Sequence, residues 1–415
     1  MGVPAHHATT RNLGALYPFA AEPGLGADGV LIGRDLLGSA FSYDPFSLYR
    51  AGILTDPNMV VVGQIGRGKS AFVKTYLWRQ SVFGRRAWVV DPKGEYGALA
   101  AAWEAVPVAL RPGGAVRLNP LDGGPGRADD DEQRRRAELL ASLAAASLGR
   151  ALLPTERSAL ELAAAEAAAC APEPTLPGVV DALLRPTAAS ARAVGTDVAG
   201  LAADGRHVAL ELRRLVAGDL RGMFDGPTSA GIDLDGPLVV LDLSAVYHSA
   251  ALGVLMTCAT AWLQGAIRRD RPGGAPGEVV VVVDEAWAIL GDLAVARWLQ
   301  SSWKLARAWG VSNVAVLHRL SDLEATGTAG SEQVGLAMGL LSDSETRVLY
   351  AQPPGEMGRS AALLGLSSTE AEIVPHLRRG VALWKVGGRS FLVEHRLSAA
   401  ERRLVDTDAR MGRRA

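Results

Sequence analysis

The segment Val61–Ser70, VVGQIGRGKS, sets three glycines, a lysine and a serine directly after a pair of valines. It fits the pattern G-x-x-x-x-G-K-[ST] at every fixed position. Glycines let the backbone fold tightly and turn its N–H groups inward, which makes a nest for phosphate oxygens. Lys69 would reach the β- and γ-phosphates of a nucleotide, and the Ser70 hydroxyl would bind Mg²⁺. The predicted nucleotide-binding residues are Gly63, Gln64, Ile65, Gly66, Arg67, Gly68, Lys69, Ser70 and Ala71.

A second acidic group for Mg²⁺ is available at Asp284, which ends the apolar run EVVVVVD. Glu285 follows directly, where its carboxylate could polarise an attacking water as a general base. The alternative is an ordinary exposed acidic pair after a core strand. Because the pair occurs in a chain with a complete phosphate loop, we expect Ser70 and Asp284 to hold Mg²⁺ and Lys69 and Glu285 to act in catalysis.

Short apolar runs predict the strands that must position these residues. A helix expected at 70–80 connects the first two strands, which makes the βαβ unit of a parallel sheet. The continuous run of valines before Asp284 fits a central strand that is buried on both faces. The fold class is therefore α/β. Strands are expected at residues 59–62, 87–91, 238–243, 278–284 and 314–317.

A block from about residue 123 to 216 is rich in Ala, Leu, Glu and Arg with helical periodicity, and prolines interrupt it. We interpret it as an all-helical insertion. Near the end, VALWKVGGRSFLVEH indicates a β-hairpin around Gly387 and Gly388. The predicted units are a small β-rich lead-in (1–55), the first part of the nucleotide-binding core (56–122), the insertion (123–216), the second part of the core (217–397) and a charged tail (398–415).

Composition indicates a globular protein, since 48% of the 415 residues are hydrophobic and 21% are charged. The net charge of −1 argues against a strongly basic nucleic-acid surface, although a local basic channel stays compatible with it. Cys170 and Cys258 show no metal-ligand spacing, and we expect both to be reduced core cysteines.

One uncharged segment, residues 250–267, is about as long as the shortest spanning helix. It contains Gly, Thr and Gln and closely follows a strand, so we expect a buried helix and no intrinsic transmembrane segment.

The order of several short motifs resembles the HerA–FtsK superfamily of hexameric motors. The motifs are LIGRDLLGSAFSYDPF, the phosphate loop, VVDPKGEYGALA, RLNPLD, VVVDEAWAIL, KLARAWGVSN and LHRLSDL. Within the superfamily, the chain looks most like the TraC-type (VirB-class) ATPases of conjugation and type IV secretion. The resemblance extends from about Gly26 to Glu394 and implies a RecA-like P-loop NTPase core that uses ATP and Mg²⁺.

The resemblance also implies roles for three further residues. In this superfamily a polar residue at the end of a strand between the two phosphate-site strands senses the γ-phosphate. His318 stands there where the family usually has Gln, and the alternative is a loop histidine with no special role. Hexamers of this kind bind nucleotide between subunits and stabilise the transition state with a neighbour's arginine. Arg307 and Arg347 are our candidates, with ordinary surface ion pairs as the alternative.

Three functions stay open from the sequence. The first is an ATPase of a conjugation or type IV secretion apparatus, cytoplasmic and held at the inner face of the membrane by membrane partners. The second is a HerA-like or coupling-protein DNA translocase, which would need a basic pore lining. The third is a nucleotide-binding regulator that hydrolyses little. The full set of Lys69, Ser70, Asp284 and Glu285 argues against the third.

Overall fold

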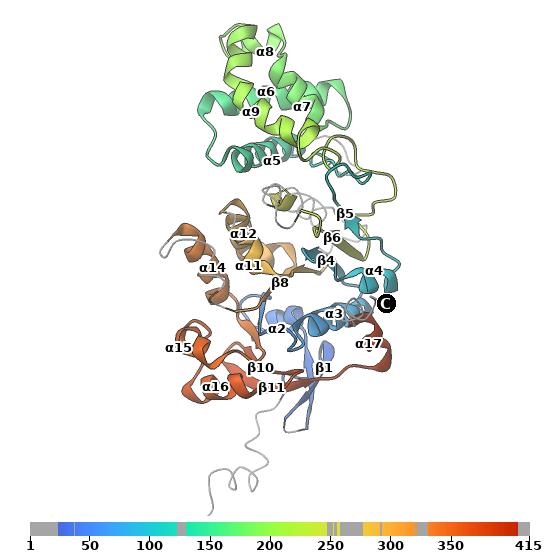
Figure 1. Ribbon diagram of the computed structural model, residues 1–415, viewed down its shortest axis with the longest axis vertical. Helices are drawn as coiled ribbons and strands as arrows, with labels where there is room; N and C mark the ends of the chain where they lie inside the picture. The colour runs from blue at the N-terminus through green and yellow to red at the C-terminus, as the bar shows by residue number, and fades with distance from the viewer. Residues whose placement is uncertain are drawn as a thin grey trace, which may run out of the picture.

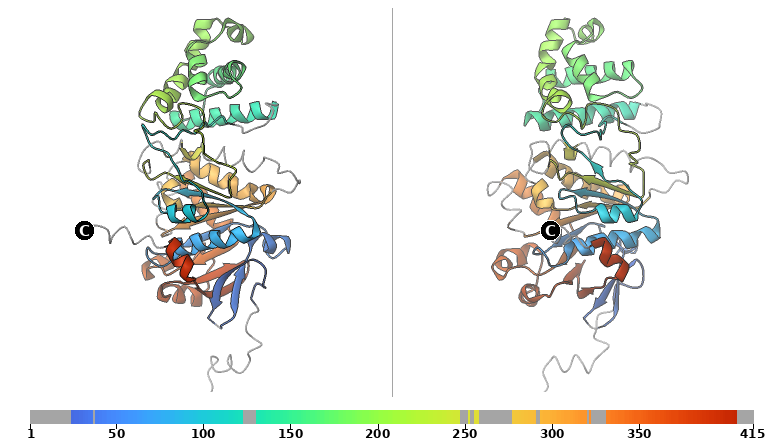
Figure 2. Two further views of the ribbon diagram at one scale, coloured as in Figure 1. Left: turned by 90° about the vertical axis from the view of Figure 1, so that its right-hand side faces the viewer. Right: turned by 45° about the vertical axis from the view of Figure 1, so that its right-hand side comes forward.

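The computed structural model describes residues 24–36, 38–122, 130–246, 252, 255–257, 277–290, 293–319, 321 and 331–405. Their strands form one large sheet with helices on both faces, and a further group of helices stands beyond one end of the sheet, at the top of Figure 1 (Figures 1 and 2). This arrangement confirms the predicted α/β class, a mainly parallel sheet flanked by helices and carrying an all-helical insertion.

The sheet contains eleven strands within the described residues, in the order β2-β1-β11-β10-β9-β3-β8-β7-β4-β6-β5. Every pairing from β9 to β5 is parallel, whereas every pairing from β2 to β9 is antiparallel. The strands are β1 (Val30–Asp35), β2 (Ala40–Tyr43), β3 (Met59–Val62), β4 (Arg86–Asp91), β5 (Val108–Ala109), β6 (Leu238–Asp242), β7 (Val279–Val283), β8 (Val311–Leu317), β9 (Thr346–Leu349), β10 (Val381–Val386) and β11 (Arg389–His395).

Alternate residues of the central strands enter two different cores. In β3, Met59 and Val61 belong to the core that contains Phe72 of α3, while Val60 and Val62 belong to the core that contains residues of α12. Every residue of β3 and β7 is buried. Because both faces are covered, the sequences of these two strands are unbroken apolar runs, mostly of valine, and do not alternate between apolar and polar residues. The helices beside the sheet are α2 (Pro45–Arg50), α3 (Lys69–Gln80), α4 (Gly97–Ala102), α11 (Ala286–Ile289), α12 (Leu293–Trp309), α14 (Glu332–Ser342), α15 (Pro354–Leu363), α16 (Ser368–Ile373) and α17 (Ala399–Val405).

The helical insertion enters after β5 and returns to the sheet at β6 (Figure 1). Its helices pack on one another through buried leucines and valines, among them Leu160, Val180, Leu183 and Leu212. Apolar residues that recur at helical spacing therefore account for its compactness. The helices are α5 (Asp130–Leu148), α6 (Pro154–Cys170), α7 (Leu176–Leu184), α8 (Ala188–Ala193) and α9 (Val198–Ala217).

Strand β8 begins earlier than the sequence predicted, at Val311 instead of residue 314. The extra residues include Ser312 and Asn313. Because both are polar, the apolar run that predicted the strand did not extend to them. Their polar groups are satisfied inside the core, because the Ser312 hydroxyl donates to the carbonyl of Pro57 and the Asn313 amide donates to Asn58 Oδ1. Buried polar groups with partners of this kind are compatible with a central strand.

Within the described residues, no helix is long and apolar enough to cross a membrane. Most of the segment 250–267, for which we expected a buried helix, lies outside them. The expectation of two core cysteines was wrong for Cys170, which is exposed at the end of α6, and Cys258 lies outside the described residues.

A buried cation ties the start of β4 to α2 and β7. The Arg85 guanidinium donates to Asp44 and to Glu278, with N–O distances of 2.8 and 2.7 Å, and its side chain is only 5% exposed. We expect Arg85→Met to lower the free energy of unfolding by about 3–5 kcal/mol, since the substitution leaves the buried carboxylate of Asp44 without its cationic partner. Urea denaturation followed by circular dichroism measures this loss.

The matched control is Arg185→Met, which removes an exposed i,i+4 pair with Asp181. Its effect should stay below about 0.5 kcal/mol. An Arg85→Met protein as stable as this control would show that the buried pair contributes nothing.

Candidate nucleotide and magnesium site

The predicted site residues meet at one edge of the sheet. Strands β3, β8, β7 and β4 are parallel neighbours, so their carboxyl ends lie side by side. The loop 63–68 follows β3, His318 follows β8, the pair Asp284 and Glu285 follows β7, and the segment with Lys93 follows β4. Ligands of open α/β sheets bind at this edge.

The loop after β3 has the conformation that its glycines predict. Gly66 and Gly68 have φ values of 78° and 112°, a left-handed region that other residues adopt only with strain. The N–H of Gly63 donates to the carbonyl of Leu317, and that of Gln64 donates to the carbonyl of Ala351. These bonds attach the loop to the ends of the adjoining strands. Helix α3 begins at Lys69, which directs its N-terminal N–H groups toward the loop.

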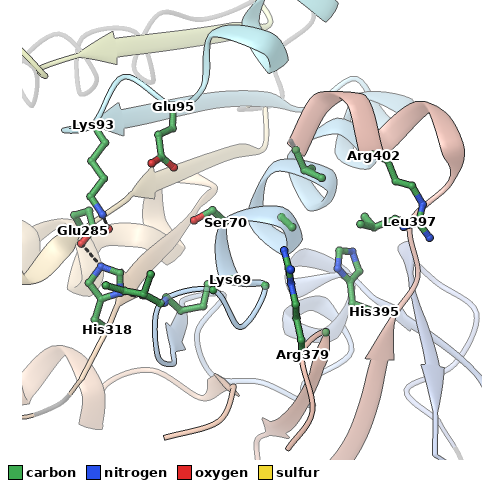
Figure 3. Close-up of a pocket in the computed structure, with 16 residues that line it drawn as sticks. Lys69, Ser70, Lys93, Glu95, Glu285, His318, Arg379, His395, Leu397 and Arg402 are labelled. Carbon is green, nitrogen blue, oxygen red and sulfur yellow. Dashed lines mark hydrogen bonds and ion pairs between the residues drawn. The ribbon is translucent and has the colours of Figure 1, made fainter. Parts of the chain in front are cut away.

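Lys69, His318 and Glu285 form a continuous chain of polar contacts (Figure 3). The Lys69 ammonium lies 3.1 Å from His318 Nδ1 and also donates to the carbonyls of Gly63 and Gln64. An ammonium group has no acceptor, so Nδ1 must accept this bond and the ring proton must lie on Nε2. His318 Nε2 lies 2.6 Å from Glu285 Oε2, in close polar contact with the carboxylate. His318 is therefore placed between the candidate phosphate-binding lysine and the candidate base.

Glu285 is held by contacts with three groups. Its side chain is 6% exposed, Oε1 accepts from Lys93, and Oε2 accepts from Trp287 Nε1 at 2.6 Å and lies against His318 Nε2. Burial alone would raise the pKa of Glu285, but these contacts outweigh it and lower the pKa to about 2. The residue also has a positive φ of 50°, a strain that folded proteins concentrate at functional sites.

Asp284 is oriented by a bond to each carboxylate oxygen. The N–H of Glu285 donates to Oδ1 at 2.9 Å, and the Tyr96 hydroxyl donates to Oδ2 at 3.1 Å. Burial and the neighbouring charge of Glu285 raise the pKa of Asp284 to about 6, and a divalent cation would favour the charged form. The oxygen donors of Asp284 and Ser70 fit Mg²⁺, which prefers a few protein oxygens together with substrate phosphates.

A cavity of about 770 Å³ opens beside the loop (Figure 3). One end contains Lys69, Ser70, Lys93, Glu285 and His318, and the other end is built from the C-terminal hairpin and α17. The sequence did not reveal this second group, because its members are distant in sequence from the phosphate loop and only tertiary pairing brings them to it. The bond from the N–H of Gly380 to the carbonyl of Arg67 is one such link. The group comprises Arg379, Gly380, His395, Leu397, Arg402 and Val405.

The two candidate arginines do not join the cavity. Arg307 donates to the carbonyl of Thr55, which precedes β3, and Arg347 lies near the start of β9, where it donates to the carbonyls of Ser344 and Leu364. Both therefore lie toward the amino ends of the central strands, away from the phosphate loop. A role for either one in a neighbouring subunit's site stays a prediction.

Comparison with protein-family models finds no match, and comparison with curated proteins finds none either. Solved structures do match. VirB4 of Thermoanaerobacter pseudethanolicus aligns with a TM-score of 0.71 at 20% identity, over 92% of this chain and 100% of that chain. The plasmid coupling protein TrwB aligns over 93% of each chain in two complexes. The complex with the non-hydrolysable ATP analogue ADPNP gives a TM-score of 0.59 at 15% identity, and the complex with ADP and Mg²⁺ gives 0.58 at 16%.

At these identities the likeness establishes the fold. The chain has the RecA-like P-loop fold shared by VirB4 and TrwB, as the resemblance in sequence predicted. The site geometry described above comes from this chain's own residues.

A partly buried histidine makes the wall of the cavity sensitive to acid. Burial and the charge of Arg79 lower the pKa of His395 to about 4, from an ordinary value of 6.5. Between these values the unfolded chain binds a proton that the folded chain does not, so stability is complete above pH 6.5 and falls as the pH drops toward 4. When the pH falls from 7 to 5, we expect His395 to lower the free energy of unfolding by about 2 kcal/mol.

The measurement is the free energy of unfolding at pH 7 and pH 5 for the wild type and His395→Gln. The wild type should lose about 2 kcal/mol more than the variant. His376→Gln, at an exposed position, is the control and should behave as the wild type. Equal losses for the wild type and His395→Gln would contradict the assignment.

Proposed function

We propose that this chain is an ATP-hydrolysing motor of a conjugative transfer or type IV secretion apparatus. The observation that carries the proposal is the meeting of Lys69, His318 and Glu285 in one chain of polar contacts, at the edge where open α/β sheets bind ligands. The likeness to VirB4 over 92% of the chain supports the choice of machine.

Each group of the site has a separate role in phosphoryl transfer. Inward-facing N–H groups of the loop and the Lys69 ammonium bind the β- and γ-phosphates. Ser70 and Asp284 hold Mg²⁺, which neutralises charge on the phosphate oxygens when it is bound. Glu285 orients a water in line with the terminal phosphorus and accepts its proton as the bond to the leaving oxygen breaks. His318, which contacts both Lys69 and Glu285, couples phosphate binding to the position of the base.

Assembly of the chain into a ring would explain why Arg307 and Arg347 lie away from the cavity of their own subunit. In a homo-hexamer with nucleotide between subunits, Arg307 or Arg347 would stabilise the transition state in a neighbouring site. Partner proteins of the secretion apparatus would hold such a ring at the inner face of the cell membrane.

DNA translocation is the second candidate. The likeness to the plasmid coupling protein TrwB favours it, at a lower TM-score of 0.59. Such a motor would bind DNA through phosphate contacts, and hydrolysis would depend on that binding.

The deciding measurement is the steady-state ATPase rate with Mg²⁺, in the absence and presence of single- and double-stranded DNA. We expect hydrolysis that Lys69→Ala and Glu285→Gln each reduce by at least about 100-fold, because each removes a group that acts on the transferred phosphoryl. EDTA should abolish it. Lys304→Ala, an exposed lysine on α12, is the matched control and should retain the wild-type rate.

The effect of DNA on the ATPase rate distinguishes the two candidate functions. A rate that DNA leaves unchanged favours the secretion ATPase, whereas strong stimulation that both active-site variants abolish favours the translocase. No hydrolysis under any condition, with nucleotide still bound, would contradict both and favour a nucleotide-binding regulator.

A further inference from the structure

Lys93 is a charged group at the site for which the reaction described above has no role. It lies in the turn after β4, and Asp91 holds this turn by accepting the N–H groups of Lys93 at 3.2 Å and of Tyr96 at 2.9 Å. The backbone of the turn is therefore fixed, while the side chain of Lys93 is 40% exposed and lines the same cavity as Lys69 and Ser70. Its ammonium donates to Glu285 Oε1 (Figure 3).

This contact restrains the base. An ionised carboxylate has about four acceptor positions; those on Glu285 accept from Lys93 and Trp287, and His318 lies against Oε2. Lys93 is the only one of these three groups on Oε1 among the described residues. A water that is to lose its proton to Glu285 needs an accessible oxygen, and Lys93 is placed to cover it.

Among the three groups around the Glu285 carboxylate, Lys93 is the one able to exchange partners. His318 is 15% exposed and is held on its other nitrogen by Lys69. Trp287 lies two residues after Glu285, on the short helix α11 that begins directly after it. Lys93 has a flexible four-carbon stem and a compact charge that depends little on direction. A terminal phosphate seated on Lys69 would enter the cavity that Lys93 lines and would offer a larger negative charge than the single carboxylate.

We propose that Lys93 is a positioning residue that exchanges the carboxylate of Glu285 for the terminal phosphate of a bound nucleoside triphosphate. The exchange frees Oε1 of Glu285 for the attacking water only when the third phosphate is present. A diphosphate, held by the loop alone, leaves the Lys93–Glu285 pair in place. The inference rests on the proposed function, since it assumes that the site binds nucleotide.

A purely structural ion pair makes a different prediction. If Lys93 only braced the turn after β4, its removal would affect diphosphate and triphosphate binding alike. If it exchanges partners, the loss falls on the triphosphate. The ratio of the two affinities therefore separates the alternatives.

The experiment is isothermal titration of the full chain with ADP and with adenylyl imidodiphosphate, both with Mg²⁺. We expect the wild type to prefer the triphosphate analogue. Lys93→Met should weaken binding of that analogue about 10- to 100-fold, the range for a charge-assisted hydrogen bond, and should leave ADP affinity within about twofold. Lys93→Arg, which keeps the charge, should restore most of the preference. Lys304→Met is the matched control and should bind both ligands as the wild type does.

A spectroscopic measurement follows the exchange directly. The chain is labelled with 5-fluorotryptophan, and the Trp287 resonance is assigned with Trp287→Phe. Because Trp287 donates to the same carboxylate, its ¹⁹F signal should shift with adenylyl imidodiphosphate and not with ADP. In Lys93→Met the difference between the two ligands should disappear.

The results distinguish failure of this inference from failure of the proposed function. Equal losses for both ligands in Lys93→Met, or unchanged affinity for both, would overturn the exchange while leaving the nucleotide site intact. A wild type with no preference for the triphosphate analogue would overturn it as well. A wild type that binds neither ligand would overturn the proposed function and this inference together.

Discussion

The whole site depends on the parallel pairing of β3, β8, β7 and β4. Parallel strands require crossover connections and covered faces, so all four strands are buried on both sides, and β3 and β7 consist largely of valine. The same pairing places four carboxyl ends at one edge, with adjacent strands about 4.8 Å apart. Residues from distant parts of the chain, such as Lys69 and Glu285, can meet there without any long loop. The parallel direction of these strands therefore determines which side chains can meet at the site.

That edge also concentrates negative charge. Asp91 and Asp242 are register partners at the ends of β4 and β6, and Asp284 and Glu285 follow the neighbouring strand. Burial raises the pKa of Asp91 and of Asp284. So many carboxylates in a low-dielectric setting require compensating donors. The amides of the turn after β4, the hydroxyl of Tyr96 and the ammonium group of Lys93 supply them. Lys93, which we propose to contact the terminal phosphate, therefore also stabilises one of the protein's own acids.

The sequence predicted the parts of the site in which local pattern and function coincide. A phosphate loop is a continuous segment, and an acidic pair after five valines carries its strand with it, so Lys69 and Glu285 could be placed. The polar beginning of β8 was missed because the partners of Ser312 and Asn313 are distant in sequence. Arg379 and His395 were missed for a similar reason, since only tertiary structure brings the C-terminal hairpin against the loop. The positions of Arg307 and Arg347 depend on which end of a strand each one adjoins, and a motif does not reveal that.

The strand order has a consequence for how the chain is made. β3 emerges early from the ribosome, but both of its neighbours, β8 and β9, lie in the last third of the sequence, and β1 pairs with β11 near the other terminus. The helical insertion contains mostly local contacts and can fold while translation continues. Until β8 and β9 are made, β3 has no strand partners. Its four residues, which are buried in the folded chain, and both of its hydrogen-bonding edges are then exposed. Unfinished chains therefore present an aggregation-prone strand, and synthesis of this protein places a demand on chaperones until its final hairpin is complete.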